Sequence, residues 1–224
     1  MAEIYIVSTP IGNRQDISLR ALAVFRQLDY LLCEDTRKTR QLLTFYQIKP
    51  WPQLVSFYEQ NESARIPEVL GWLKQGKAVG LVTNAGTPLI SDPGFKLVRE
   101  CSKENIQIVA IPGASAVLAA LVVSGLPTDK FTFLGFLPKK AGKKEKLLRE
   151  IKSTTIAYES PFRLVKTLEL LQKLRPEAQV VICRELTKKF EEVIRGKPEE
   201  ILEKIHAKVK GEIVILISTM SRQV

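Results

Sequence analysis

The sequence lacks the common signatures of nucleotide and metal chemistry. It contains neither the G-x-G-x-x-G fingerprint of dinucleotide-binding domains nor the G-x-x-x-x-G-K-[ST] pattern of a P-loop, which argues against NAD-dependent and ATP-hydrolysing enzymes. It has one histidine, His206, and three widely separated cysteines, so a zinc site, a Ser-His-Asp arrangement and a disulfide framework are not expected. We expect no bound metal, and we expect Cys33, Cys101 and Cys183 to be packing residues.

Long hydrophobic runs are also missing. No segment has the roughly 18 consecutive apolar residues of a membrane helix, and the first residues run directly into a strand-like segment rather than through a basic and then apolar leader. With 45% hydrophobic and 26% charged residues, the chain has the composition of an ordinary globular protein. We expect a cytoplasmic protein that does not interact with membranes, long enough at 224 residues for two domains.

Strand-like runs alternate with helical periodicity along the chain. In the first half the apolar runs lie at residues 4–8, 30–33, 54–57, 78–82 and 106–111. This alternation is typical of a parallel sheet with helices on both faces. Turn residues at 124–129 interrupt it, and further runs follow at 131–136, 155–158, 180–183 and 212–217. We predict an α/β fold of two α/β domains, residues 1–114 with a parallel sheet and residues 115–224 with a mixed sheet.

Short turns containing glycine and proline follow three of the predicted strands in the first half. They lie at residues 8–13 (STPIGN), 85–88 (AGTP) and 111–115 (IPGAS). In an open α/β sheet, ligands bind outside the carboxyl ends of the strands, so these turns predict one small-molecule site. Proline fixes its own φ and glycine tolerates positive φ, which lets backbone amides approach a ligand closely.

The second turn belongs to a connection, residues 83–94, that is longer than a strand-to-helix link requires. It contains two prolines, two glycines and the polar residues Thr87, Ser91 and Asp92, and we expect it to hold a ligand. Asp92 has an alternative role as the N-cap of the following helix, with Pro93 at the first helical position.

Charged residues gather at the ends of three predicted strands. The groups are residues 34–37 (EDTR), 158–163 (YESPFR) and 183–188 (CRELTK). Charges at the carboxyl ends of strands are candidates for catalysis or substrate positioning. For the first group a structural alternative stays open, because Asp35 or Thr36 is a sound N-cap and Arg37, Lys38 and Arg40 could form a solvated helix face.

Positive charge is concentrated in the second half of the chain. The formal net charge is +10, and residues 101–224 hold 22 Lys and Arg against 14 Asp and Glu, whereas residues 1–100 hold 12 against 10. Seven of the cations fall within residues 139–152. Such a cluster would attract a polyanion such as nucleic acid, and the alternative is a solvated, lysine-rich linker and helix face.

The ordered motifs resemble the ribosomal RNA small subunit methyltransferase I family, a branch of the tetrapyrrole methylase superfamily. The resemblance runs from about residue 4 to residue 217. It rests on TPIGN at 9–13, EDTR at 34–37, AGTPLISDPG at 85–94, PG at 112–113, GFLP at 135–138, YESP at 158–161, RELTK at 184–188 and GE at 211–212. It implies S-adenosylmethionine as methyl donor in a cleft between the two domains, a homodimer, and methylation of a cytidine ribose 2′-hydroxyl in the 16S RNA of the small ribosomal subunit.

Carried over by position, the resemblance implies a set of cofactor contacts, whereas the catalytic and RNA candidates come from the charged residues described above. The cofactor contacts are Pro10, Gly12, Ala85, Gly86, Thr87, Pro88, Leu89, Ser91, Pro112, Gly113, Ala114, Ser115, Ala116, Leu137, Tyr158 and Glu159. The catalytic candidates are Glu34, Asp35, Arg37, Asp92 and Glu159. Among them we favour the Glu34–Asp35 pair as general base, with Arg37 on a substrate phosphate. The candidate RNA contacts are Lys139, Lys140, Lys143, Lys144, Arg163 and Arg184.

Three positions depart from the family pattern. Asn84 stands in place of a usual aspartate, Ala114 in place of a common proline, and Phe162 in place of a common histidine. Asn84 and Phe162 leave open a non-catalytic role as a basic RNA-binding or assembly factor. Other branches of the superfamily leave open a second alternative, methylation of a tetrapyrrole precursor of the cobalamin type. The positive charge of the second half favours RNA over a corrin-type substrate.

Overall fold

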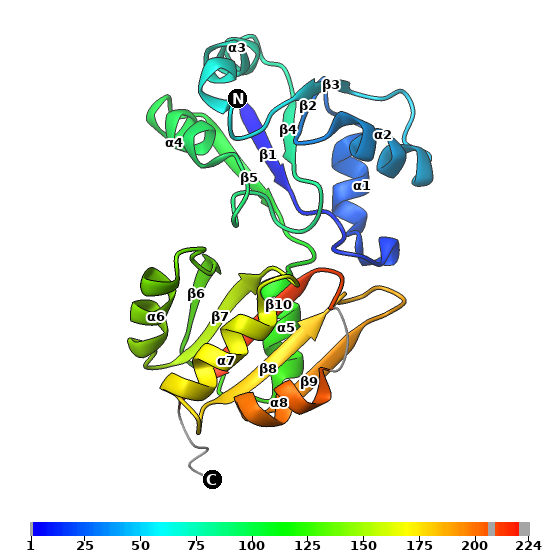
Figure 1. Ribbon diagram of the computed structural model, residues 1–224. Helices are drawn as coiled ribbons and strands as arrows, with labels where there is room; N and C mark the ends of the chain where they lie inside the picture. Colours follow the sequence, from blue (N-terminus) through cyan, green and yellow to red (C-terminus); the bar gives the residue numbers. More distant parts are fainter. Residues whose placement is uncertain (1, 206–208, 220–224) are drawn as a thin grey trace. The chain divides into compact units, whose positions relative to one another are not determined.

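The computed structural model describes residues 2–205 and 209–219, and the chain divides into two compact units between Ser115 and Ala116. Each unit is built around one five-stranded sheet (Figure 1). His206 lies outside the described residues. Within the described ranges no helix is long and apolar enough to cross a membrane, and no three acidic, histidine or cysteine side chains come together as metal ligands.

The first unit contains an all-parallel sheet of order β3-β2-β4-β1-β5, as predicted. Its strands are β1 (Glu3–Val7), β2 (Tyr30–Cys33), β3 (Gln53–Ser56), β4 (Val79–Val82) and β5 (Gln107–Ile111). Its helices are η1 (Arg14–Asp16), α1 (Leu19–Phe25), α2 (Thr36–Phe45), α3 (Glu62–Lys74) and α4 (Phe95–Lys103). Parallel neighbours need a crossover between them, which is why strand-like and helical patterns alternate along the sequence.

Two apolar clusters account for the packing of this sheet. One includes Leu73 of α3 and Leu97 of α4, and the other includes Phe25 of α1 and Leu43 of α2. Every residue of β4 is buried, as expected for a strand covered on both faces. The three cysteines are buried and free, and burial raises the pKa of the Cys33 thiol to about 12. The prediction that they are packing residues is confirmed.

The second unit contains a mixed sheet of order β6-β7-β10-β8-β9, again as predicted. Only the β6–β7 pair is parallel. The strands are β6 (Phe131–Phe136), β7 (Thr154–Glu159), β8 (Gln179–Arg184), β9 (Glu192–Gly196) and β10 (Ile213–Ser218). The helices are α5 (Ala116–Ser124), α6 (Ala141–Arg149), α7 (Leu164–Leu174) and α8 (Pro198–Lys204). The sequence did not predict β9, an edge strand of five partly or fully exposed residues that includes two charged ones.

Candidate active site

The three Gly/Pro turns of the first unit meet at one edge of its sheet. They follow β1, β4 and β5, which lie next to one another in the order β4-β1-β5 and run parallel, so their carboxyl ends share an edge. The backbone N–H of Ser8 donates to the carbonyl of Ile111 at 3.1 Å. Thr9 and Gly86 exchange two backbone hydrogen bonds, at 2.9 and 3.0 Å, in an isolated bridge beyond the strand ends. The turns therefore form one structure.

The side chain of Thr87 joins the same three turns. Its hydroxyl donates to the carbonyl oxygen of Ala114 at 3.1 Å and accepts from the hydroxyl of Ser8 at 3.1 Å. One residue of the middle turn thus bonds to both of its neighbours, which fixes the relative positions of residues 8, 87 and 114.

Two glycines make this close approach of the turns possible. A Cβ atom at Gly113 would lie 2.9 Å from the Cβ of Ser8, which is closer than side chains tolerate. Gly86 has a φ of +81°, in the left-handed region, and a Cβ there would lie 3.3 Å from Ile11. Larger residues at either position would push the turns apart.

The donor set of these turns fits a sulfonium nucleoside such as S-adenosylmethionine. Such a molecule needs hydrogen-bonding groups for an amino-acid carboxylate and a ribose, together with room beside the backbone. The turns offer the Ser115 hydroxyl and the hydroxyl oxygens of Ser8 and Thr87, whose protons are donated within the turns, as acceptors. The small residues Ala85 and Ala114 leave the backbone accessible to a ligand. The residues present therefore fit the cofactor that the resemblance implies.

The connection after β4 is shaped by two unusual backbone conformations. Leu89 and Ser91 both have positive φ, at 71° and 68°, although neither is glycine. Such conformations cost free energy and are found where surrounding structure enforces them, often at ligand sites. The alternative role of Asp92 as the N-cap of the next helix is wrong, because α4 begins at Phe95 with Gly94 at the N-cap position.

A carboxylate from α3 caps α4 instead. Oε1 of Glu62 accepts hydrogen bonds from the backbone N–H groups of Gly94, Lys96 and Leu97 at 3.1, 3.0 and 3.4 Å. Glu62 is buried, and it satisfies amides that a helix start otherwise leaves unpaired. Asp92 is therefore not needed as a cap.

Asp92 and Glu34 form a carboxylate pair at this edge of the sheet. Glu34 follows β2, the neighbour of β4, and it accepts a hydrogen bond from the backbone N–H of Asn84 at 3.2 Å. Desolvation by burial, and then the negative charge of Glu34, raise the pKa of Asp92 to about 6, against a smaller opposing effect of a hydrogen bond with Thr83. A carboxyl that titrates near 6 suits a general base at neutral pH.

Asp35 has the structural role that the sequence left open. It is the N-cap of α2, and its side chain accepts from the backbone N–H groups of Arg37 and Lys38 at 2.9 and 3.4 Å. The hydrogen bond from Arg37 is the largest cause of a lowered pKa at Asp35. A carboxylate that is stabilised in this way is a weaker base than Asp92. The Arg37 side chain is 88% exposed and reaches within 3.8 Å of Asp35.

In the second unit, Leu137 and Tyr158 lie at the carboxyl ends of the parallel pair β6 and β7. The backbone N–H of Leu137 donates to the carbonyl of Tyr158 at 3.0 Å, and the Arg163 guanidinium donates to the carbonyl of Leu137 at 3.2 Å. The second unit thus brings these two predicted cofactor contacts together. Their assignment to the cofactor rests on the resemblance and stays a prediction.

Glu159 is the centre of a buried ionic network. Its side chain is fully buried, and its oxygens lie 2.8 Å from Nζ of Lys144 and 2.6 Å from the Arg163 guanidinium. The Thr167 hydroxyl and the backbone N–H of Ser160 also donate to it, both at 2.7 Å. With four donors around it, the Glu159 carboxylate is a poor candidate for a base that must accept a substrate proton.

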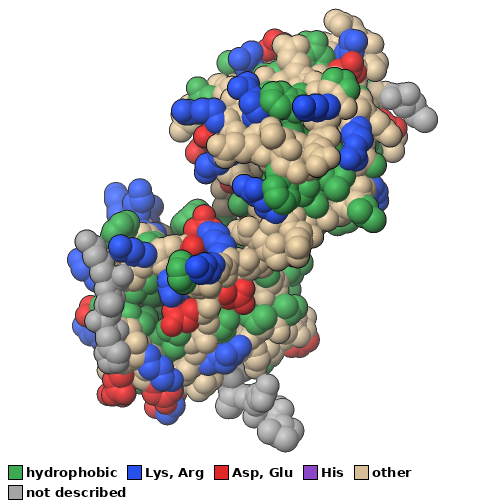
Figure 2. Space-filling model, turned by 90° about the vertical axis from the view of Figure 1, so that its right-hand side faces the viewer, with side chains coloured by type: hydrophobic (Ala, Val, Ile, Leu, Met, Phe, Trp, Pro, Cys, Tyr) green, Lys and Arg blue, Asp and Glu red, His purple; other side chains and the backbone are tan. Residues whose placement is uncertain are grey.

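The network corrects the expectation for Lys144, because a lysine with a buried ammonium group held by Glu159 and Thr167 is not available to RNA. Arg163 and Arg184 are also engaged, since Arg184 pairs with Glu192 at 2.9 Å. Three of the predicted RNA contacts remain exposed, namely Lys139, Lys140 and Lys143. Figure 2 shows one face of the molecule, where Lys and Arg side chains stand among acidic and hydrophobic ones in both units.

Comparison with known proteins identifies the family. A family model of tetrapyrrole (corrin/porphyrin) methylases matches residues 3–202. The chain belongs to this methylase family. Two relatives of the methylase, from Thermotoga maritima and Hydrogenobaculum sp., are each named ribosomal RNA small subunit methyltransferase I. They are 44% and 43% identical to it, over 97% and 96% of this chain and 99% and 95% of theirs, so the methylase belongs to their branch and the resemblance is confirmed.

A solved structure of the uroporphyrin-III C-methyltransferase from Thermus thermophilus, in complex with S-adenosylhomocysteine, has the same fold. Its TM-score is 0.65 at 16% identity, and the similarity covers 97% of each chain. At this identity the likeness concerns the fold alone. The predicted two-sheet α/β architecture and the prediction of a methyltransferase family with S-adenosylmethionine as cofactor are confirmed.

Sequence reasoning missed three residues of the methylase that organise its candidate site. Glu62 reads in the sequence as an ordinary acidic residue at a helix start, and no local pattern links it to residues 94–97. Lys144 reads as part of a basic run and Thr167 as a helix residue, and only the tertiary structure brings both to Glu159.

Proposed function

We propose that this methylase transfers a methyl group from S-adenosylmethionine to ribosomal RNA of the small subunit, at a ribose 2′-hydroxyl of a cytidine. The observation that carries the proposal is the identity of 43–44% over nearly the whole chain to relatives named ribosomal RNA small subunit methyltransferase I. The joined turns of the first unit support it, because they supply a site at the sheet edge where α/β proteins bind ligands.

In this proposal the turns of residues 8–13, 85–91 and 112–116 bind the cofactor. Bonding among Ser8, Thr87 and Ala114 holds the turns in position before the ligand arrives, so little ordering is required on binding. Positioning of this kind accounts for a large part of catalysis in a two-substrate transfer, because well-oriented reactants gain about 7–11 kcal/mol.

The cofactor supplies an activated methyl group on a sulfonium, and the chain supplies the base. We assign that role to Asp92, whose carboxylate accepts the proton of the ribose hydroxyl. A raised pKa makes the Asp92 carboxylate more basic than an ordinary aspartate, and this rise comes first from burial and then from the negative charge of Glu34. The backbone N–H of Asn84 donates a hydrogen bond to Glu34 of this pair. Asn84 stands where the family usually has an aspartate, but Asp92 and Glu34 still provide carboxylates at this edge of the sheet.

The proposed reaction is tested with labelled S-adenosylmethionine and small ribosomal subunits that lack the modification. Incorporation of label, mapped by nuclease digestion to a ribose of one cytidine, is the expected result. Label on a base, on protein, or nowhere on the subunit would contradict the proposal. A parallel incubation with naked small-subunit RNA determines whether the assembled particle is required.

Two further assignments are proposals. We propose a homodimer, which rests on the resemblance and which light scattering at micromolar concentration would detect. We also propose a cytoplasmic location, which agrees with a ribosomal substrate. The two alternative functions predict other results in the same assays. A tetrapyrrole methylase would label a corrin-type precursor instead of RNA, and a non-catalytic factor would release no heat with S-adenosylmethionine in calorimetry.

A further inference from the structure

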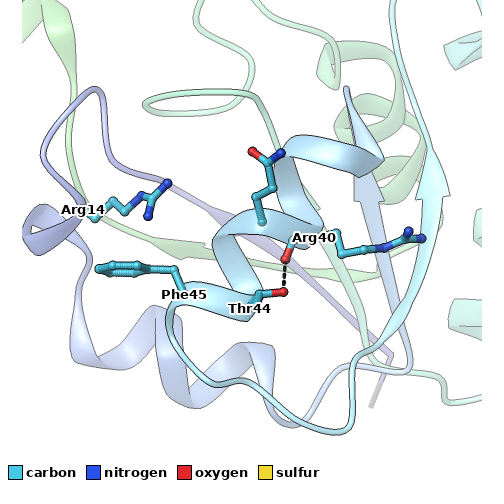
Figure 3. Close-up of a pocket in the computed structure, with 5 residues that line it drawn as sticks. Arg14, Arg40, Thr44 and Phe45 are labelled. Atoms are coloured by element: carbon cyan, nitrogen blue, oxygen red, sulfur yellow. Dashed lines mark hydrogen bonds between the residues drawn. The ribbon is translucent and has the colours of Figure 1, made fainter.

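A hollow of about 360 Å³ lies beside α2, and it includes Arg14, the residue that follows the first joined turn. It is lined by Arg14 of η1 and by Arg40, Gln41, Thr44 and Phe45 of α2 (Figure 3). With Trp51 these residues make up what we call the α2 surface. Its volume is within the range of sites that hold small organic ligands.

Arginine and aromatic side chains are paired at two places on the α2 surface. The Arg14 guanidinium lies 4.5 Å from the centroid of the Phe45 ring, and the Arg40 guanidinium lies 5.7 Å from that of Trp51. Figure 3 shows Arg14 and Phe45 pointing toward each other, while Arg40 extends in the opposite direction from α2. Phe45 and Trp51 are 51% and 41% exposed, so their rings are open to a ligand as well as to the arginines.

The α2 side of this surface carries only positive charge, whereas η1 adds Asp16 two residues after Arg14, and both of these charges act on Tyr46. Residues 36–58 contain four Lys and Arg and no Asp or Glu. Among the residues that the structure describes, no carboxylate lies within ion-pair distance of Arg14 or Arg40. These guanidinium groups are therefore available to an anionic partner. Arg14 is also held in place, because its carbonyl oxygen accepts a hydrogen bond from the Tyr46 hydroxyl.

We propose that the α2 surface binds a single-stranded segment of RNA, with bases stacked on the Phe45 and Trp51 rings or on the arginine planes and phosphates held by Arg14 and Arg40. Aromatic rings interleaved with cations are what single-stranded nucleic acid requires, since every base has a face that stacks and every nucleotide carries a charge. This inference rests on the proposed function, which makes RNA the substrate. It locates an RNA contact in the first unit, whereas the sequence pointed to the basic run of the second.

The position of the surface along the chain agrees with this role. The helix begins at Thr36, two residues after Glu34, so α2 directly continues the end of β2 that carries Glu34, one of the two carboxylates of the proposed catalytic pair. Arg37 lies in the first turn of α2, between Glu34 and Arg40 in sequence, and its side chain is almost fully exposed. An RNA strand bound along α2 from Phe45 toward Thr36 would run toward the end of the helix that follows Glu34.

The test measures binding of the full-length protein to a fluorescent single-stranded oligoribonucleotide at several salt concentrations. Phe45→Ala is expected to raise Kd about 5- to 150-fold, the range that corresponds to removal of one stacking aromatic. The double variant Arg14→Ala/Arg40→Ala is expected to lower the slope of log K against log salt by about 1.4, because each lost phosphate contact contributes about 0.7 on a single strand.

The first unit offers a matched control. The Arg99 guanidinium lies 5.8 Å from the ring of Phe95, which is 63% exposed, but Arg99 also pairs with Glu100 at 3.2 Å. Arg99→Ala and Phe95→Ala are expected to leave RNA affinity unchanged. Phe45→Leu, which keeps an apolar side chain without an aromatic face, distinguishes lost stacking from a folding defect and is expected to bind as weakly as Phe45→Ala. Thermal unfolding should show all variants folded.

Several outcomes would overturn the inference. They are an unchanged Kd in the α2 variants, equal losses in the Arg99 and Phe95 controls, and a wild-type protein that does not bind RNA. A loss of dimers in the α2 variants by light scattering would assign the surface to a second copy of the chain. The subunit methylation assay tests the proposed reaction separately. If the wild type methylates subunits and the α2 variants bind RNA normally, only the RNA-binding role of the α2 surface is rejected. If the α2 variants lose RNA binding but the wild type does not methylate subunits, only the proposed reaction is rejected.

Discussion

Glu62 Oε1 accepts a hydrogen bond from the backbone N–H of Gly94 at 3.1 Å, so the start of α4 is capped by a residue of α3. The Glu62 carboxylate pairs with the first amides of α4 and interacts favourably with the helix dipole, so no side chain of the preceding loop is needed as a cap. The carboxylate of Asp92, two residues earlier, therefore has no capping role. This relationship is what makes Asp92, rather than Asp35, the better candidate for the proposed base.

Replacing Asp92 by Asn is expected to slow single-turnover methyl transfer by about 10²- to 10⁴-fold, the usual contribution of a general base. Affinity for S-adenosylmethionine, measured by calorimetry, should change little, because the side chain acts on the RNA hydroxyl. Asp35→Asn is the matched control. Asparagine is as good an N-cap as aspartate, so this variant should keep both the helix and the activity. Slow transfer in Asp35→Asn with normal transfer in Asp92→Asn would restore the Glu34–Asp35 hypothesis.

The pH dependence of the reaction should report the same carboxyl. With a pKa of about 6, Asp92 is protonated and inactive as a base at low pH. The rate is therefore expected to rise about tenfold per pH unit below 6 and to level off above it. In Asp92→Asn the residual rate should lack this limb. A wild-type profile that is flat between pH 5 and 8 would exclude a base with this pKa.

Folding stability should respond to Asp92 with the opposite trend. Because the pKa is raised in the folded state, ionisation of Asp92 disfavours folding, so the stabilisation is complete below the ordinary pKa of 3.8 and is lost as pH rises through about 6. We expect about 1 kcal/mol, since solvent screens a partly exposed carboxyl. Urea denaturation at pH 4, 5, 6 and 7 should show a smaller decline for Asp92→Asn than for wild type. Parallel curves for the two proteins would contradict this expectation.

The buried network of the second unit predicts an unequal response of two adjacent lysines. Lys144→Ala removes one partner of a buried ion pair and should lower the free energy of unfolding by about 3–5 kcal/mol. Lys143→Ala removes an exposed cation and should change it by less than about 0.5 kcal/mol. Chemical denaturation of both variants decides the matter. Equal effects would mean that the Glu159 carboxylate does not depend on Lys144.

The turn geometry predicts a large effect for one added methyl group. Gly113→Ala would place a Cβ 2.9 Å from that of Ser8, so we expect about 1–3 kcal/mol of destabilisation and weaker binding of S-adenosylmethionine. Gly142, in α6, has no atom within 4 Å of such a Cβ, and Gly142→Ala should be neutral or slightly stabilising. Unfolding curves and calorimetry on both variants provide the comparison. Unaltered cofactor affinity in Gly113→Ala would separate this contact from the binding site.

Much of the fold could be predicted because the parallel sheet imposes its pattern on the sequence. Strands such as β4, covered on both faces, appear as continuous apolar runs, and Gly/Pro turns mark the strand ends. The edge strand β9 escaped prediction because its residues are half-exposed and charged, so neither alternation nor an apolar run identifies it. A hydrophobic pattern in the sequence reflects the burial of a strand, and an edge strand such as β9 has few buried residues to produce such a pattern.

The candidate site was predictable in its backbone and less so in its side chains. The turns at residues 8–13, 85–88 and 111–115 have local signatures of glycine and proline, and parallel topology requires their strand ends to share an edge. The roles of Glu62 and Lys144 depend on partners far away in the chain, and a basic residue in a basic run gives no sign that its ammonium group is buried. Long-range pairing of charges is what the sequence could not reveal.

The two reciprocal hydrogen bonds between Thr9 and Gly86 have a consequence for the dynamics of the first unit. Since the two bonds join the same pair of residues, a local opening event that separates the two turns breaks both bonds and exposes both amides to solvent. The two amides should therefore exchange at similar rates, although they lie in different turns. A ligand that contacts only one of these turns and stabilises the bridge would slow hydrogen exchange at both amides. Its binding would therefore be detected at the residue of the bridge that it does not contact.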